Sequence, residues 1–251
     1  MLSEAKAVYS ATKKKNDFLF NTYVMRPIAA AFVGPIGRMG FSPNQVTLVG
    51  LFVSLLGAAL LVVFPSYSGV LLAILVLEIG YMLDCVDGML ARYKGIASKQ
   101  GHLFDFFTDE IKALALLACL GAHLWRAGVD LPGLQLAPGS DAILHISLAG
   151  AFILASATSL TNFVRRPEMS GRETTVEAYK EHAEKSKPTS PLGKVVAAIM
   201  TFLSFFGHYP SHIYVWALLG RLDLYFLLYI AFNGLYLAKG WAGLLIRFGR
   251  S

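Results

Sequence analysis

Long apolar runs separated by short polar turns are the feature that most constrains this chain. A helix that crosses a membrane needs about 20 predominantly apolar residues. The sequence predicts six such spans: Val46–Phe64, Gly69–Leu83, Leu103–Trp125, Ala142–Val164, Val195–Leu219 and Leu224–Ala238. Composition agrees, because only 15% of the residues are charged, against about 25% in soluble domains. We therefore expect an all-α integral membrane protein with six transmembrane helices, the fifth bending at Pro210.

The segment before these spans has a different character. Phe18–Phe32 is apolar but carries polar interruptions, and we expect Gly34 and Pro35 to end it. Such a segment predicts an amphipathic helix lying in the membrane interface, with a broken seventh span as the alternative. Residues 1–40 would then form a cytoplasmic or interfacial segment, and residues 41–246 the six-helix bundle of a single domain.

The distribution of basic residues predicts the orientation in the membrane. If both termini are cytoplasmic, Arg126 and Arg221 are the two exceptions among 22 Lys and Arg residues. The positive-inside rule favours this arrangement, and a multi-pass protein of an inner or cytoplasmic-type membrane follows. The net charge of +6 suits an anionic membrane surface better than a nucleic acid. Cys85 and Cys119 lie in apolar runs, so we expect packed core residues and no disulfide.

Four aspartates lie at the cytoplasmic ends of the second and third spans. Asp84 and Asp87 are three residues apart, and Asp105 and Asp109 are four apart, so each pair shares one helix face. The connecting turn is short, and we expect the four carboxylates to converge. Two carboxylates about 6 Å apart repel by roughly 3 kcal/mol at an effective dielectric constant of 20. They must therefore take up protons or bind divalent cations, and oxygen ligands suit two Mg²⁺ or Mn²⁺ ions.

Small and basic residues accompany the aspartates. Gly88 and Ala91 leave the helix surface beside the acids without large side chains. Gly101, at the start of the next helix, likewise has no side chain that would fill the cavity. Arg92, one turn beyond Gly88, can offer its guanidinium to phosphate oxygens. Together with the aspartates, these residues predict a site for a metal-bound diphosphate.

The complete pattern, D-x2-D-G-x2-A-R-x8-G-x3-D-x3-D from Asp84 to Asp109, resembles the signature of the CDP-alcohol phosphotransferases, also called the CDP-alcohol phosphatidyltransferase family. Members of this family are six-span membrane enzymes. They transfer a substituted phosphate from a CDP-linked donor to an alcohol and release CMP. The resemblance implies the same activity here, in the lipid bilayer, and a homodimer; no nucleic acid is expected as a partner.

The family pattern also implies roles for individual residues. Asp84, Asp87, Asp105 and Asp109 resemble the ligands of two divalent ions. Asp109 further resembles the general base that takes the proton of the acceptor hydroxyl. Residues 43–47 resemble the family's P-N-x-x-T segment near the nucleotide. Contacts with the CDP donor are implied for Asn44, Thr47, Gly88, Ala91, Arg92, Ser98 and Gly101.

Four further residues are candidates for binding the acceptor alcohol: Lys112, Asn162, Arg165 and Arg166. Lys112 is seven residues after Asp105 and so lies on nearly the same helix face as the acids. It can contact the substrate or neutralise the edge of the site. Arg165 and Arg166 end the fourth span, where a basic helix end could hold a phosphorylated polyol. They can equally be basic residues that extend towards the membrane surface.

The favoured hypothesis is transfer of a phosphatidyl group from CDP-diacylglycerol to a small cytosolic alcohol. The alternative within the family is a CDP-choline or CDP-ethanolamine type of phosphotransferase acting on diacylglycerol. A magnesium-dependent intramembrane prenyltransferase is a less favoured alternative. An ion carrier would leave Gly88, Arg92 and Gly101 unexplained. The donor, the acceptor and the choice of Mg²⁺ or Mn²⁺ stay open.

Overall fold

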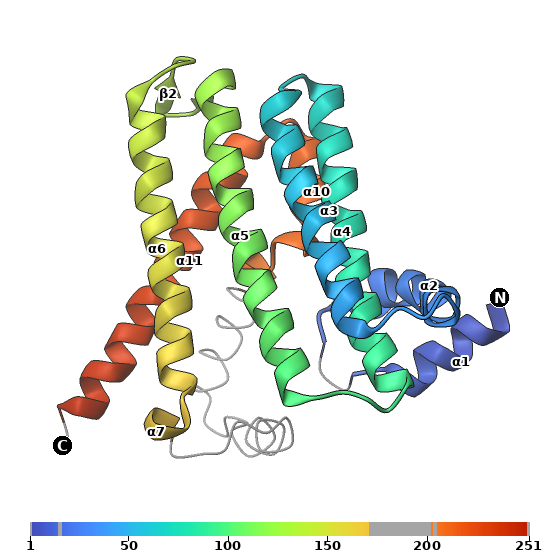
Figure 1. Cartoon of the computed structure of the whole chain (residues 1–251). Helices are drawn as coiled ribbons and strands as arrows, with labels where there is room; N and C mark the ends of the chain where they lie inside the picture. The colour runs from blue at the N-terminus through green and yellow to red at the C-terminus, as the bar shows by residue number, and fades with distance from the viewer. Residues whose placement is uncertain (1, 15–16, 171–201, 203–204, 250–251) are drawn as a thin grey trace.

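The computed structural model describes residues 2–14, 17–170, 202 and 205–249 and is built almost entirely from helices (Figure 1). The N-terminal part contains α1 (Leu2–Thr12), a single π-helical turn η1 (Asn21–Met25) and α2 (Arg26–Arg38). The long helices are α3 (Pro43–Val63), α4 (Tyr67–Tyr93), α5 (Lys99–Ala127), α6 (Asp141–Arg165) and α11 (Leu222–Phe248). The short elements are strands β1 (Val129–Leu131) and β2 (Leu134–Leu136), helix α7 (Pro167–Ser170), the 3₁₀ turn η2 (Tyr209–Ser211) and α10 (Ile213–Leu218).

Serine residues start the three helices that carry the predicted site. The hydroxyls of Ser42, Ser66 and Ser98 each accept a hydrogen bond from the backbone N–H three residues later. This satisfies one of the free N–H groups in the first turns of α3, α4 and α5. Ser98 therefore fixes the start of α5 at Lys99, six residues before Asp105.

Helices α3 and α4 form a closely packed antiparallel pair. A Cβ atom added to Gly57 on α3 would lie 2.8 Å from the backbone nitrogen of Leu77 on α4. A Cβ on Gly80 would lie 3.0 Å from the backbone nitrogen of Ser54. The first distance is shorter than real Cβ contacts and the second is at their lower limit, so the two glycines allow the helix backbones to approach each other. This contact fixes the position of the residues that α3 and α4 contribute to the site.

Three helices among the described residues are long and apolar enough to cross a membrane: α3, α4 and α6. Large apolar side chains on their outer surfaces are exposed, including Phe52 (67%) on α3 and Phe152 (72%) on α6. Such continuous apolar surfaces suit lipid rather than water. Helices α5 and α11 are 29 and 27 residues long, but polar residues lower their apolar content. The predicted total of six spans is therefore supported only in part.

The first part of the fifth predicted span, Val195–Leu219, lies outside the described residues, which resume with residue 202 and then with residues 205–219. Its described end is broken at the expected place, because Pro210 lies in η2 and separates α10 from the residues before it. Proline interrupts a helix because it lacks the backbone N–H that would bond to the preceding turn.

Two features of local structure differ from what the sequence predicts or lie beyond it. Helix α2 does not end at Gly34 and Pro35 but continues to Arg38, because Pro35 lies near its C-terminal end, where its carbonyl still accepts from Met39 N–H at 3.1 Å. Gly34 instead allows α1 to approach, since an added Cβ would lie 2.9 Å from Cδ of Glu4. The loop after α5 contains a small antiparallel hairpin of β1 and β2, an element that the pattern of apolar runs does not predict.

The arrangement of the helices places the two predicted aspartate pairs at one end of the bundle. Helices α1 and α2 lie at the end that contains the α4–α5 turn, and the β hairpin lies at the opposite end (Figure 1). Helix α11 runs obliquely across α5 and α6 (Figure 1) and packs against both. The N-terminal segment therefore borders the C-terminal half of α4 and the start of α5.

Candidate active site

Three of the four aspartates of the motif come together between α4 and α5. One carboxylate oxygen from each of Asp84, Asp105 and Asp109 lies within 4.8 Å of the others. Their exposure differs: the side chain of Asp84 is 17% exposed and that of Asp109 is 51% exposed. Oxygen Oδ1 of Asp105 is buried and has no hydrogen-bond partner among the described residues. A buried carboxylate oxygen without a partner is costly, so this group is suited to receive a ligand.

The fourth aspartate, Asp87, is bound by a different residue. It is 4% exposed and accepts a hydrogen bond from the hydroxyl of Thr47 on α3. Thr47 belongs to the P-N-x-x-T segment, which the structure thus brings to the motif across 40 residues of sequence. The expectation that all four carboxylates converge holds for three of them, with Asp87 held beside the group by α3.

Lys112 lies among the aspartates rather than at their edge. Its side chain is 3% exposed, and its ammonium group donates to Asp84 on α4 and to Asp109 Oδ1 at 3.0 Å. Lysine is almost never buried to this degree unless it is paired. The structure therefore places this residue in direct contact with the acids.

The residues predicted to bind the donor form close contacts on α4 and between α3 and α5. An added Cβ on Gly88 would lie 3.3 Å from Nη1 of Arg92, so the guanidinium lies directly over the bare glycine. An added Cβ on Gly101 would lie 3.2 Å from Oγ of Ser98 and 3.5 Å from Oδ1 of Asn44. Ala91, which lies between Asp87 and the end of α4, is partly buried. All seven predicted donor contacts lie on the adjoining ends of α3, α4 and α5.

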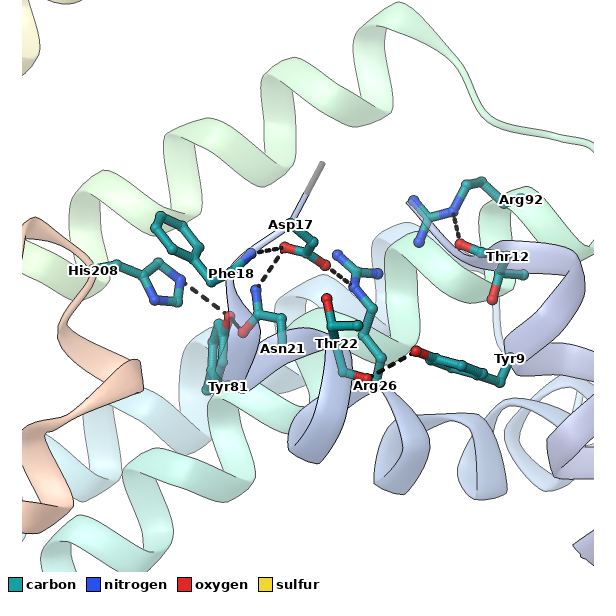
Figure 2. Close-up of polar contacts among 10 residues, drawn as sticks. All are labelled: Tyr9, Thr12, Asp17, Phe18, Asn21, Thr22, Arg26, Tyr81, Arg92 and His208. Atoms are coloured by element: carbon teal, nitrogen blue, oxygen red, sulfur yellow. Dashed lines mark hydrogen bonds and ion pairs between the residues drawn. The ribbon is translucent and has the colours of Figure 1, made fainter. Parts of the chain in front are cut away.

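Arg92 is held in place by the N-terminal segment. Its Nε donates to the backbone carbonyl of Thr12 at 3.2 Å (Figure 2). Its Nη2 is buried and has no hydrogen-bond partner among the described residues. The backbone contact leaves the outer guanidinium nitrogens available, and a phosphate group is a suitable partner for them.

The other predicted acceptor residues, on α6, contact residues of α5 that neighbour the motif aspartates in sequence. Asn162 donates to Oε1 of Glu110 at 2.7 Å, and the guanidinium of Arg165 lies 4.9 Å from the centre of the Phe106 ring. Asn162 and Arg166 line a shallow groove between α5 and α6. Glu110, which follows Asp109, thus faces this groove and not the acid cluster.

The N-terminal segment is joined to α4 by a series of polar contacts (Figure 2). Arg26 donates to Asp17, which also accepts from Nδ2 of Asn21 at 3.0 Å. The hydroxyl of Tyr81 donates to Oδ1 of Asn21 and lies 3.1 Å from Nε2 of His208. Tyr81 is three residues before the first motif aspartate, so this network ends beside the acid cluster.

Residue spacing and hydrophobic periodicity do not reveal this network. The available signal is that Asn21 and Arg26 interrupt an otherwise apolar stretch. Both are buried, at 5% exposed each, and buried polar groups are normally paired. Their partners are not predictable from local periodicity, because Tyr81 and His208 are separated from this segment by long stretches of sequence.

Electrostatics support a firm attachment of this segment. Burial raises the pKa of Asp17, but the charge of Arg26 and the hydrogen bonds from Arg26 and Asn21 outweigh it, and the pKa lies below its ordinary value. Burial lowers the pKa of Lys14, and the positive charges of Arg26 and Arg92 lower it further. Three basic side chains thus gather where the N-terminal segment meets the end of α4, which favours binding of an anion.

The acid cluster fits a divalent metal ion. Its ligands are carboxylate oxygens, which Mg²⁺ and Mn²⁺ prefer, and the unpartnered Oδ1 of Asp105 supplies a free ligand atom. The two cysteines are free and contribute no ligand here. The chemistry of the group thus agrees with the ion predicted from the motif.

Comparison with known proteins decides the family. The sequence profile described as CDP-alcohol phosphatidyltransferase matches residues 41–242, which is most of the chain. The chain belongs to the CDP-alcohol phosphatidyltransferase family. The resemblance inferred from the motif is thereby confirmed. The profile begins after α2, so the N-terminal network of this CDP-alcohol phosphatidyltransferase is formed largely by residues that precede the matched region.

Several proteins with assigned names are similar to this family member. An archaetidylinositol phosphate synthase of Pyrococcus horikoshii is 32% identical over 83 residues, which are 33% of this chain and 42% of that protein. A phosphatidylinositol phosphate synthase of Streptomyces avermitilis is 30% identical over 166 residues, which are 66% of this chain and 60% of that protein. The matched part thus spans less than two thirds of either relative.

Proposed function

We propose that this chain transfers a phosphatidyl group from CDP-diacylglycerol to a hydroxyl of an inositol phosphate, with release of CMP. The observation that carries the proposal is the cluster of the Asp84, Asp105 and Asp109 carboxylates, which have oxygen atoms within 4.8 Å of one another. Arg92, on the same helix as Asp84, has a buried Nη2 without a partner among the described residues. The acceptor class is taken from the two similar synthases.

Binding of the donor would use the residues around Gly88. The bare surface of α4 admits the diphosphate, and Arg92 donates to its oxygens. Asn44 and Ser98 would face the nucleotide side, where Gly101 leaves space. Thr47 keeps Asp87 in position through its hydroxyl.

The aspartates would hold two divalent ions, with Asp87 joining the other three. When bound, such ions neutralise charge on the diphosphate and on the departing CMP. Asp109, the aspartate with the half-exposed side chain, would accept the proton of the acceptor hydroxyl. The hydroxyl oxygen then forms a bond to the phosphorus of the phosphatidyl group, the bond from that phosphorus to CMP breaks, and CMP leaves with the electron pair.

The groove between α5 and α6 supports an acceptor with a phosphate of its own. Arg166 would provide positive charge and Asn162 an amide in its lining, and Arg165 lies next to Arg166 in the chain, over the Phe106 ring. As part of the same proposal, the reaction takes place at the cytoplasmic face of the membrane. A homodimer is also proposed, and the mass of the purified protein in detergent would test it.

The test is release of CMP by the purified protein in lipid nanodiscs. CDP-diacylglycerol would be offered with inositol phosphate, inositol, glycerol phosphate, serine or choline, each with and without EDTA. We expect release with inositol phosphate only, loss of release in EDTA, and recovery when Mg²⁺ or Mn²⁺ is added. Full activity in EDTA would contradict the metal site.

Two variants would test the acceptor groove. Changing Arg165→Gln and Arg166→Gln together should raise KM for inositol phosphate at least tenfold. Arg38→Gln is the matched control, because Arg38 pairs with Glu4 on the exposed surface and such pairs contribute little. Release of CMP from CDP-choline with diacylglycerol, and none from CDP-diacylglycerol, would replace the proposal by its alternative.

A further inference from the structure

Lys112 is a cation that the chain itself places inside the proposed metal site. It lies on α5 one turn after Asp109 and reaches across to Asp84 on α4. Its side chain is 3% exposed, and both of its hydrogen bonds are to aspartates of the motif. Of the two roles that the sequence leaves open for this lysine, its contacts favour neutralisation of the acids over binding of the acceptor.

The ammonium group binds two of the carboxylates that a divalent ion would use. Oδ1 of Asp84 and Oδ1 of Asp109 each accept from Nζ of Lys112. Asp84 and Asp109 are also two of the three residues able to surround one ion. An ion bound between them would share these carboxylates with the ammonium or displace it, and like charges at such short range repel strongly.

We infer that Lys112 is an internal counter-ion that holds Asp84 and Asp109 together while no divalent ion is bound, and that it lowers the affinity of the site by competing with that ion. This inference rests on the proposed metal site. Lysine suits such an exchange, because its ammonium is a point charge on a flexible four-carbon stem. Removal of the charge should therefore strengthen metal binding and weaken the metal-free protein.

The experiment measures Mn²⁺ binding directly, without CDP substrates. Free Mn²⁺ would be followed by electron paramagnetic resonance during titration of the purified protein, of Lys112→Met and of Lys112→Arg. We expect Lys112→Met to bind Mn²⁺ at least tenfold more tightly and Lys112→Arg to stay within threefold of the original protein. Lys94→Met is the matched control, because Lys94 is exposed and donates to the carbonyl of Phe41.

Thermal melting provides an independent measurement. In EDTA, Lys112→Met should melt at a lower temperature than the original protein, and saturating Mn²⁺ should reduce or remove the difference. If Lys112→Met cannot be purified without metal, Lys112→Gln, which keeps a polar side chain of similar length, would be prepared in Mn²⁺ and its release of the ion to EDTA timed. Slower release than from the original protein supports the inference.

The outcomes separate this inference from the proposed function. Equal or weaker Mn²⁺ binding by Lys112→Met overturns the inference while leaving the metal site intact. Absence of binding in every variant overturns the metal site and the inference with it. The expected shift in affinity in a protein that releases no CMP would uphold the role of Lys112 and contradict only the proposed reaction.

Discussion

Exposure distinguishes the aspartates of the motif from one another. Asp87 is 4% exposed and is fixed by Thr47, whereas the side chain of Asp109 is 51% exposed. A buried carboxylate bound by a hydroxyl is suited to a fixed structural or ligand role. A carboxylate open to solvent can accept a proton from an incoming alcohol and later release it to water.

At this scale we predict that Asp109→Asn lowers the rate of CMP release by about 10²–10⁴-fold, the range typical of general-base catalysis. Donor affinity should change much less, because Gly88, Arg92 and the remaining aspartates are intact. Both quantities would be measured on the same purified protein. The control is Asp141→Asn, an exposed acid in the first turn of α6 at the opposite end of the bundle.

A near-normal rate in Asp109→Asn would contradict its assignment as the base. A parallel fall in turnover and donor binding would instead make it mainly a metal ligand.

At the scale of single elements, the N-terminal segment is the part that the sequence predicts least well. Its amphipathic character is apparent, and α2 forms within it. The contact of Tyr81 with Asn21, however, joins residues 60 positions apart, and hydrophobic periodicity carries no information about such pairs. The site on α4 and α5 is easier to predict from the sequence, because its residues lie within 26 positions of each other. Their spacing alone places them on facing helices.

We predict that Asp17→Asn loosens this segment. The side chains of Asp17 and Arg26 are 9% and 7% exposed, and breaking a buried ion pair typically costs about 3–5 kcal/mol. The melting temperature should fall, and KM for the CDP donor should rise more than kcat falls, because the contact of Thr12 with Arg92 is weakened. Glu4→Gln, in the exposed pair with Arg38, should have little effect on either.

The same variant has a defined pH dependence. Because the pKa of Asp17 is lowered in the folded protein, the pair stabilises it fully above the ordinary pKa of about 4 and loses this effect as the pH falls through the lowered value. The melting temperatures of the original protein and of Asp17→Asn should therefore converge in acid. A constant difference between them would contradict the ion pair as the cause.

At the scale of the whole molecule, hydropathy predicts the helices well where they are uniformly apolar. The expected Val46–Phe64 and Ala142–Val164 correspond to α3 (Pro43–Val63) and α6 (Asp141–Arg165). It is less informative for α5, whose first half carries the charged residues of the site, and it does not foresee the β hairpin. Membrane orientation depends on the distribution of charge and needs its own test.

We predict that Ser98, in the α4–α5 turn, faces the cytoplasm and that the β hairpin faces the other side. Ser98→Cys and Gln135→Cys would be made separately in a protein that lacks Cys85 and Cys119. In intact cells an impermeant maleimide should label position 135 and reach position 98 only after the membrane is opened. The reverse labelling would contradict the orientation.

The contacts of Thr12 and Asn21 with α4 bear on which residues a shortened form of this protein must keep. The region shared with the family begins at residue 41, yet residues before it hold Arg92 and contact Tyr81. The region that matches the family and the region whose residues pack together thus have different boundaries. A protein trimmed to the shared region would keep the whole motif while losing the groups that orient its arginine.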